Sequence, residues 1–146
     1  MLHMSDAAAL AVHAVAVLAA ASGRRRSTRE IAETLSASEA HLSKVLQRLN
    51  RVGLVRSVRG PRGGFTLARD PGDITLLEVY EAIDGPFAPC TCLLGSAVCG
   101  GGSCVMGDLL TGLNDLVHDY LARTTLSVLP PFGSAPLPLA AEGGRP

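Results

Sequence analysis

The stretch STREIAETLSASEAHLSKVLQRLNRVG, residues 27–53, predicts two helices separated by a tight turn. Ser27 and Glu30 have the capping-box spacing that begins a short helix of about two turns. Ser38 then caps a longer helix that ends before Gly53, a typical left-handed end residue. The apolar side chains of this longer helix recur with helical spacing at Leu42, Val45, Leu46, Leu49 and Val52, which predicts a core-facing side. This order of elements is that of a helix-turn-helix.

The residues that follow predict a β-hairpin. Segments 54–59 and 64–68 have the pattern of short strands, joined by the turn Gly60-Pro61-Arg62-Gly63. A hairpin directly after a helix-turn-helix forms a wing. Its tip carries Arg59 and Arg62, which we expect to reach the phosphate backbone or the minor groove of a duplex.

Three further helices are predicted around this centre. Residues 6–22 are strong helix formers that are apolar on nearly every face, which indicates a helix buried on most sides. Thr75 and Glu78 repeat the capping box and begin a helix that runs to Gly85. Residues 106–125 form a long amphipathic helix whose apolar stripe is either core or a dimer seam.

The predicted fold is mainly α with a small β-hairpin wing, a winged helix-turn-helix followed by a long C-terminal helix, the candidate dimerisation helix. With 146 residues the chain suits one compact unit. The tail after residue 126 contains five prolines and little charge, so we expect it to be disordered or loosely packed. The predicted parts are a DNA-binding domain (1–85), a cysteine-rich sensor loop (86–104), the dimerisation helix (105–126) and the tail (127–146).

Charge is distributed unevenly along the chain, although the formal net charge is zero. Residues 24–62 hold ten of the thirteen basic side chains against three glutamates, a net charge of +7. Residues 63–146 hold three basic and nine acidic side chains, a net charge of −6. A basic half of this kind predicts a surface that binds a polyanion, with an ordinary solvated charged face as the alternative.

The candidate DNA contacts lie at the helix-turn-helix and the wing. Ser38 acts as a helix cap alone or as a cap and a contact, and His41 is a surface or DNA-contacting residue rather than a metal ligand. We expect side chains near the start of the second helix to reach base edges. The predicted set is Ser27, Thr28, Ser38, Glu39, His41, Ser43, Lys44, Arg48, Arg56, Arg59, Arg62 and Gly63.

Neither a membrane span nor an export signal is expected. The apolar run 7–21 is shorter than the roughly 20 residues that a spanning helix needs. Its positive charges, at residues 24–26, follow the run instead of preceding it, unlike those of a secretory signal. We therefore expect a cytoplasmic protein with reduced thiols, and we predict no catalytic residues.

All four cysteines fall within fifteen residues, at Cys90, Cys92, Cys99 and Cys104. Thiolates clustered in a reduced protein favour soft metal centres over structural disulfides. The spacing lacks the two closely spaced pairs of most zinc sites. An iron–sulfur cluster is the first interpretation, and a zinc site or a thiol redox switch are the alternatives.

Residues 5–126 resemble a family of winged-helix regulators that includes IscR, NsrR and CymR. The most specific portion is GLVRSVRGPRGGFTLAR (53–69) with ITLLEVYEAIDG (74–85). The resemblance implies a homodimer that binds double-stranded DNA and regulates transcription, with the long C-terminal helix crossing to the partner subunit. The alternative from another class is a small thiol redox protein that does not bind DNA.

The resemblance also implies a metal site. Some members hold a 2Fe–2S or 4Fe–4S cluster through three cysteines before the dimer helix, and Cys92, Cys99 and Cys104 match these three. The gaps of six and four residues depart from the more even spacing of the family. Cys90 is an additional thiol, and the fourth ligand is Cys90, His13 or Asp6. His13 is alternatively a core histidine, and other members of the family sense through bound partners or thiol oxidation.

Overall fold

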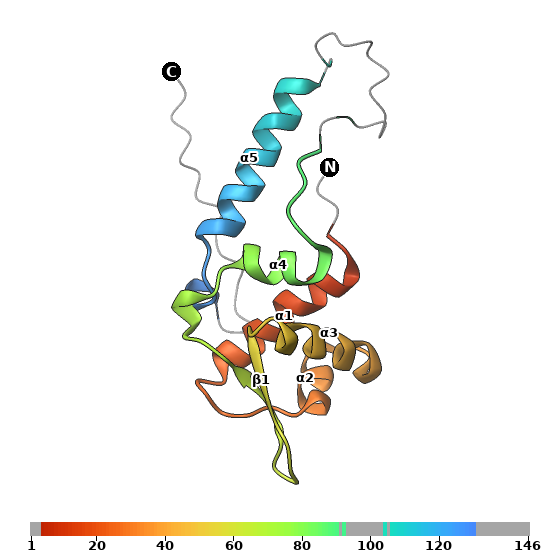
Figure 1. The fold of residues 1–146 in the computed structure, drawn as a ribbon, viewed down its shortest axis with the longest axis vertical. Coiled ribbons are helices and arrows are strands. Elements are labelled where there is room, and N and C mark those ends of the chain that lie inside the picture. Colours follow the sequence, from red (N-terminus) through yellow and green to blue (C-terminus); the bar gives the residue numbers. More distant parts are fainter. Residues whose placement is uncertain (1–3, 91, 93–103, 105, 131–146) are drawn as a thin grey trace.

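The computed structural model describes residues 4–90, 92, 104 and 106–130. The wing hairpin projects at one end of the molecule, α5 extends at the other end, and the remaining helices lie between them (Figure 1). The described elements are α1 (Asp6–Ala20), α2 (Thr28–Leu35), α3 (Glu39–Arg51), β1 (Val55–Val58), β2 (Gly64–Leu67), η1 (Pro71–Asp73), α4 (Leu76–Asp84), α5 (Gly107–Arg123) and η2 (Leu126–Val128). This mainly helical fold with one antiparallel hairpin confirms the predicted fold class.

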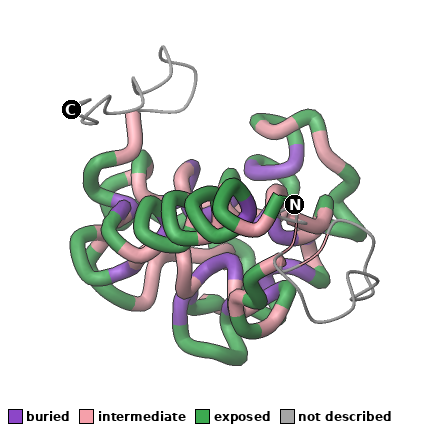
Figure 2. The backbone as a smooth tube through the Cα atoms, turned by 90° about the horizontal axis from the view of Figure 1, so that it is seen from above, coloured by how far each residue is buried: buried purple, intermediate pink, exposed green. Residues whose placement is uncertain are grey.

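The core forms where α1 packs against α3 and α4. Ala8, Ala11 and Ala14 of α1 are completely buried, and their small side chains let the neighbouring helices approach closely. Leucine, isoleucine and valine side chains from α1, α2, α3, β1 and α4 fill most of the remaining interior, while the outer turns of the helices are exposed (Figure 2). Among the described residues, none of the helices is long and apolar enough to cross a membrane.

Both predicted capping boxes are present. The Ser27 Oγ accepts a hydrogen bond from the Glu30 backbone N at 3.1 Å, and the Glu30 carboxylate accepts one from the Ser27 N at 2.7 Å. The corresponding distances between Thr75 and Glu78 are 3.2 and 3.0 Å. Ser38 caps α3 by accepting a hydrogen bond from the His41 N at 3.4 Å. The predicted starts of these three helices are therefore confirmed.

The predicted core position of Val52 is wrong, because this side chain is 54% exposed. The helix α3 ends at Arg51, and Val52 is its C-cap, with φ of −90° and ψ of 2°. Gly53 then takes the left-handed conformation predicted for it, with φ of +78°. The chain thus turns away one residue before the apolar spacing would place Val52 against the core.

The end of the long helix also differs from the prediction. The helix α5 stops at Arg123, and Thr125 forms a β-bridge with Thr75. The Leu76 N donates to the Thr124 O at 2.9 Å, and the Leu126 N donates to the Ile74 O at 3.0 Å. Leu126 is buried at the start of η2 (Leu126–Val128), so regular structure continues past the predicted boundary at residue 126. Residues 131–146 of the predicted tail lie outside the described residues.

Candidate nucleic-acid interface and cysteine site

The helix-turn-helix is set by the turn between α2 and α3. Ser36 ends α2 in the left-handed conformation, with φ of 51°, and the Ala37 N donates to the Ala32 O at 2.9 Å. This turn lets α3 bury the apolar side predicted at Leu42, Val45, Leu46 and Leu49. The opposite side of α3 is exposed and polar, and it presents Glu39, His41, Lys44, Gln47, Asn50 and Arg51.

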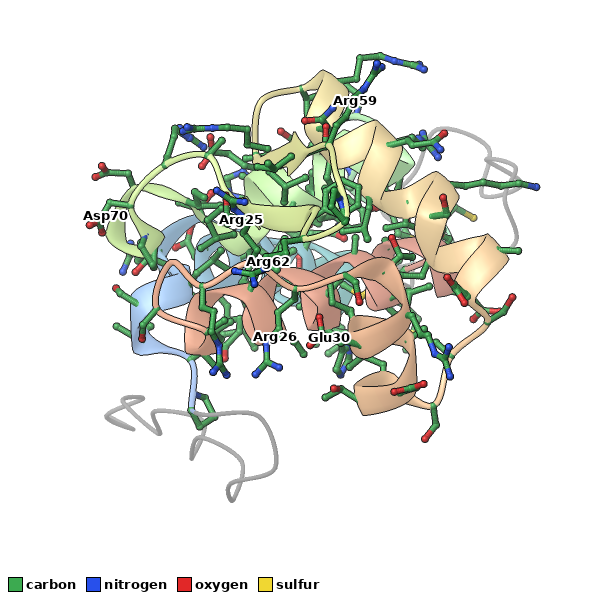
Figure 3. All side chains as sticks on the ribbon, turned by 90° about the horizontal axis from the view of Figure 1, so that it is seen from below. Arg25, Arg26, Glu30, Arg59, Arg62 and Asp70 are labelled. Carbon is green, nitrogen blue, oxygen red and sulfur yellow. The ribbon has the colours of Figure 1, made fainter. Side chains whose placement is uncertain are left out.

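The wing tip is a tight turn that presents two arginines. The Gly63 N donates to the Gly60 O at 2.8 Å, which places Pro61 and Arg62 at the two central positions of the turn. A Cβ atom at Gly63 would lie 2.4 Å from the Val58 O, so only glycine fits there. Arg59 and Arg62 are both exposed (Figure 3, which views the molecule from the wing-tip end).

A surface hollow joins the wing to the helix-turn-helix, and we call it the wing hollow. It is lined by the start of α2, the start of α3 and both sides of the hairpin. Its residues are Ser27, Thr28, Arg29, Glu39, Ser57, Val58, Arg59, Gly60, Gly63, Gly64 and Phe65. The structure therefore brings five of the predicted DNA contacts from three elements to one concave surface: Ser27, Thr28, Glu39, Arg59 and Gly63.

Two acidic side chains near the wing hollow, Glu30 and Glu33, are engaged by hydrogen bonds, whereas Glu39, which lines the hollow, makes no ion pair or side-chain hydrogen bond among the described residues. Hydrogen bonds from the Ser27 backbone and hydroxyl, with a smaller contribution from nearby arginines, lower the pKa of Glu30. Glu33 accepts a hydrogen bond from Arg29 at 2.9 Å, and this contact raises the pKa of the Arg29 guanidinium. Among the described residues, no carboxylate pairs with Arg59, Arg62 or Lys44. These cations therefore remain available to an anion.

Besides the capping residues Ser27 and Ser38, three more of the predicted contacts make hydrogen bonds within the protein. The Arg48 guanidinium donates to the Ile83 O, in the last turn of α4, at 2.7 Å. Arg56, on β1, reaches the Ala68 O at 3.5 Å. Ser43 is half-buried and accepts a hydrogen bond from Gln47 at 3.4 Å. Arg48 thus lies between α3 and α4, apart from the residues of the wing hollow.

A second hollow, of about 510 Å³, lies at the start of α5, and we call it the cysteine hollow. Asn114 fixes Cys90 there: the Cys90 N donates to the Asn114 Oδ1 at 3.1 Å, and the Asn114 Nδ2 donates to the Cys90 O at 2.9 Å. The Cys104 O accepts a hydrogen bond from the Gly107 N at 2.9 Å. The lining residues are Pro89, Cys90, Cys104, Gly107, Asp108, Leu110, Thr111, Asn114 and Asp115.

Among the described residues, the predicted ligands Cys92, His13 and Asp6 do not line this hollow. Cys92 is half-buried, and its carbonyl accepts a hydrogen bond from the Cys90 Sγ at 3.5 Å, whereas Cys99 lies outside the described residues. His13 is exposed, so its interpretation as a core histidine is wrong, and its Nδ1 donates to the Ala9 O at 2.7 Å. Asp6 is exposed at the start of α1. Within the described ranges, no three histidine, cysteine or acidic side chains gather as a metal site.

Comparison with known proteins identifies the family. The model of Rrf2, described as an iron-dependent transcriptional regulator, matches residues 4–130. The chain belongs to the Rrf2 family. The family consists of transcriptional regulators, and the described winged helix agrees with a DNA-binding regulator of this family.

Relatives and solved structures support membership of the Rrf2 family. A protein of Aquifex aeolicus, predicted to be an HTH-type transcriptional regulator, is 32% identical over 128 residues, 86% of this chain and 89% of that protein. The regulator IscR of Cronobacter sakazakii is 35% identical over 100 residues, 68% of this chain and 62% of IscR. This chain thus matches less than two thirds of the length of IscR. CymR, the global cysteine regulator of B. subtilis, superimposes with a TM-score of 0.75 at 29% identity, covering 87% of this chain and 95% of CymR.

Several residues of this Rrf2-family protein were not assigned a role from the sequence. Asn114 anchors Cys90, and Asp108 and Asp115 add carboxylates to the cysteine hollow. In the sequence, these three residues are simply polar positions on an amphipathic helix. Many surface residues share that property, so the sequence could not single them out. The sequence showed only that residues 24–26 add positive charge. The structure adds their location, because Arg26 pairs with Phe65 of β2.

Proposed function

We propose that this Rrf2-family protein is a sequence-specific DNA-binding regulator in the cytoplasm whose affinity for DNA is controlled by an iron–sulfur cluster. The observation that carries the DNA-binding part is the wing hollow, where predicted contacts from α2, α3 and the wing converge. If the backbone of one DNA strand bound in the wing hollow, the start of α3 would enter the major groove. Arg59 and Arg62 would then reach the adjacent backbone or minor groove.

The exposed face of α5 supports a homodimer. Leu109, Leu113, Leu116 and Tyr120 recur at helical spacing on this face, and each is more than two-fifths exposed. A row of large apolar side chains of this kind favours burial against a partner. We propose that α5 of a second copy covers it, because a dimer would present two copies of α3 to successive half-sites of a duplex.

The cysteine hollow suits a soft metal centre. It places the thiol-bearing residues Cys90 and Cys104 on one concavity with room for a small cluster, and Cys92 and Cys99 lie on the same short segment of chain. Thiolates are the ligands that iron–sulfur clusters and zinc prefer. We propose that these four cysteines supply the ligands. A bound cluster would supply redox-sensitive bonds between the segment that follows α4 and the start of α5.

A chain of contacts connects the cysteine hollow with α3. The Phe87 N donates to the Glu81 carboxylate at 2.9 Å, which holds the segment that leads to Cys90 against α4. Arg48 then joins the last turn of α4 to α3 through the Ile83 O at 2.7 Å. A displacement of residues 86–90 would therefore reach the DNA-reading helix through two hydrogen bonds. This arrangement supports coupling between the metal site and DNA affinity.

The first test is a visible absorption spectrum, with iron and acid-labile sulfide assays, on protein purified without oxygen. We expect a brown protein with matched iron and sulfide, and loss of colour in Cys90→Ser and Cys104→Ser but not in Thr111→Ser, a control in the same hollow. Duplex binding should differ between the loaded and the stripped protein. A protein that stays colourless after reconstitution would exclude the cluster and leave zinc or thiol oxidation as the signal on the same DNA-binding scaffold.

A further inference from the structure

The connection between α1 and α2 carries three successive arginines, residues 24–26, which we call the arginine strap. The structure places this strap against the wing. The Arg26 N donates to the Phe65 O at 3.0 Å, and the Phe65 N donates to the Arg26 O at 2.8 Å. The strap therefore joins the free edge of β2 through a single antiparallel β-bridge, beside the hairpin that carries Arg59 and Arg62.

The fit between strap and wing depends on one glycine. A Cβ atom at Gly64 would lie 2.6 Å from the Arg26 O and 3.1 Å from the Ser27 N. Gly64 also has φ of +153°, a conformation that other residues rarely adopt. The backbone at Gly64 is therefore what permits the close approach of the strap to β2.

The two faces of this small sheet differ in character. Arg26 is paired with Phe65, whose side chain packs against the core, so both lie on the inner face. Arg26 is correspondingly half-buried and lies 3.8 Å from Glu30. Thr66 and its partner Arg56 lie on the other face of the hairpin, and Arg25, next to the bridge residue, is exposed.

The other two arginines of the strap differ from Arg26. Arg24 and Arg25 are exposed, and within the described part of the chain neither makes an ion pair or a side-chain hydrogen bond. Arg26, in contrast, is engaged by Glu30. The strap thus adds two guanidinium groups that no ion pair engages among the described residues, and Figure 3 shows Arg25 on the wing-tip side of the molecule.

We propose that Arg24 and Arg25 bind backbone phosphates of DNA beside the wing and so lengthen the footprint of each subunit on the duplex. This inference rests on the proposed DNA-binding function. Guanidinium groups match the geometry of phosphate oxygens and are weakly hydrated, which suits them to this contact. Phosphate contacts fix the position of a protein on DNA and carry no sequence information.

The test is fluorescence anisotropy of the full-length protein at several salt concentrations. One labelled duplex carries a sequence selected by the wild-type protein from a random pool, and a second duplex is unrelated. Each lost phosphate contact should reduce the slope of log K against log salt by about 0.9, so the double variant Arg24→Ala/Arg25→Ala should lose about 1.8. Affinity for both duplexes should fall by the same factor.

Two further variants make the result specific. Arg123→Ala removes one exposed positive charge from the end of α5 and should leave the slope unchanged. Arg25→Lys keeps the charge and should keep most of the slope. A double variant with the wild-type slope would overturn the role of the strap while leaving the DNA-binding function standing. A wild-type protein that fails to bind either duplex saturably would overturn the proposed function itself.

Discussion

At the scale of single residues, Gly64 decides whether the wing closes against the arginine strap. We predict that Gly64→Ala lowers the free energy of unfolding by roughly 2–3 kcal/mol, because the new Cβ atom would overlap the Arg26 O in a conformation that alanine disfavours. Urea denaturation followed by circular dichroism would measure the loss. The new methyl group should also break the two backbone hydrogen bonds of the bridge.

Gly53 provides a matched control for this variant. It also has a positive φ, of +78°, but a Cβ atom added there meets nothing within 4 Å. Gly53→Ala should therefore cost only the conformational strain, roughly 1 kcal/mol. Equal losses for the two variants would mean that the close approach of Arg26 to Gly64 contributes nothing to stability.

At the scale of elements, Arg48 joins α3 to α4. Arg48→Ala should destabilise the protein by about 1–2 kcal/mol, because the Ile83 carbonyl loses a charged hydrogen-bond donor at 2.7 Å. Arg51→Ala, on the exposed side of the same helix, should change stability by less than about 0.5 kcal/mol. Thermal unfolding of the two variants side by side makes the comparison. Identical melting curves would show that Arg48 is an ordinary surface side chain.

The start of α4 should make stability depend on pH. Burial alone would raise the pKa of Glu78, but hydrogen bonds from Thr75 and Arg69 lower it overall, below the usual value of 4.5. A carboxylate whose folded pKa is lowered stabilises the fold above its unfolded pKa, and this contribution is lost as the pH falls through the folded pKa. Glu78→Gln should thus be less stable than wild type at pH 7, and the difference should shrink below pH 4.5.

The glutamine variant keeps a side chain that can complete a capping box, so it isolates the effect of the charge. Glu78 is partly exposed, and we expect a difference of less than about 1 kcal/mol at neutral pH. Urea denaturation at a series of pH values measures it. If the stability of the two proteins differed by the same amount at every pH in the acid range, the lowered pKa of Glu78 would be contradicted.

At the scale of the whole molecule, the exposed stripe of α5 predicts assembly. Leu116 is 66% exposed, the most exposed apolar side chain of that stripe. Leu116→Glu should convert a dimer into a monomer in sedimentation velocity, with helical content unchanged, because the new carboxylate would be buried without a partner charge in the seam. Arg123→Glu introduces the same residue at an exposed polar position of α5 and should stay dimeric. A wild-type protein that sediments as a monomer would exclude the proposed seam.

The sequence predicted the elements well because their ends are local. The capping boxes at Ser27 and Thr75 and the left-handed Gly53 depend on neighbours within a few residues, and the structure contains all three. Val52 was misplaced because a periodic pattern does not contain the residue at which the helix turns away from the core. Helix boundaries are set partly by packing that a pattern cannot represent.

The candidate sites were less predictable because their contacts join distant parts of the chain. The spacing of residues on α3 placed Arg48 on its outer side, but the partner of Arg48 is 35 residues away on α4. Likewise, the cysteine spacing contains no sign of Asn114, 24 residues after Cys90. The strap reached the wing through the pairing of Arg26 with Phe65, which depends on the fold as a whole.

The bridge between Thr75 and Thr125 has a mechanical consequence. It anchors the C-terminal end of α5 to the start of α4, whereas the other end of the same helix bears the cysteine hollow. The seventeen residues of α5 span about 25 Å, so the anchored end at Thr125 and the cysteine end of the helix lie far apart. If α5 tilted about its anchored end, the two threonines would move very little and the cysteine end of the helix would move the most. Any small change in the tilt of α5 would therefore be largest where Cys90 and Cys104 lie.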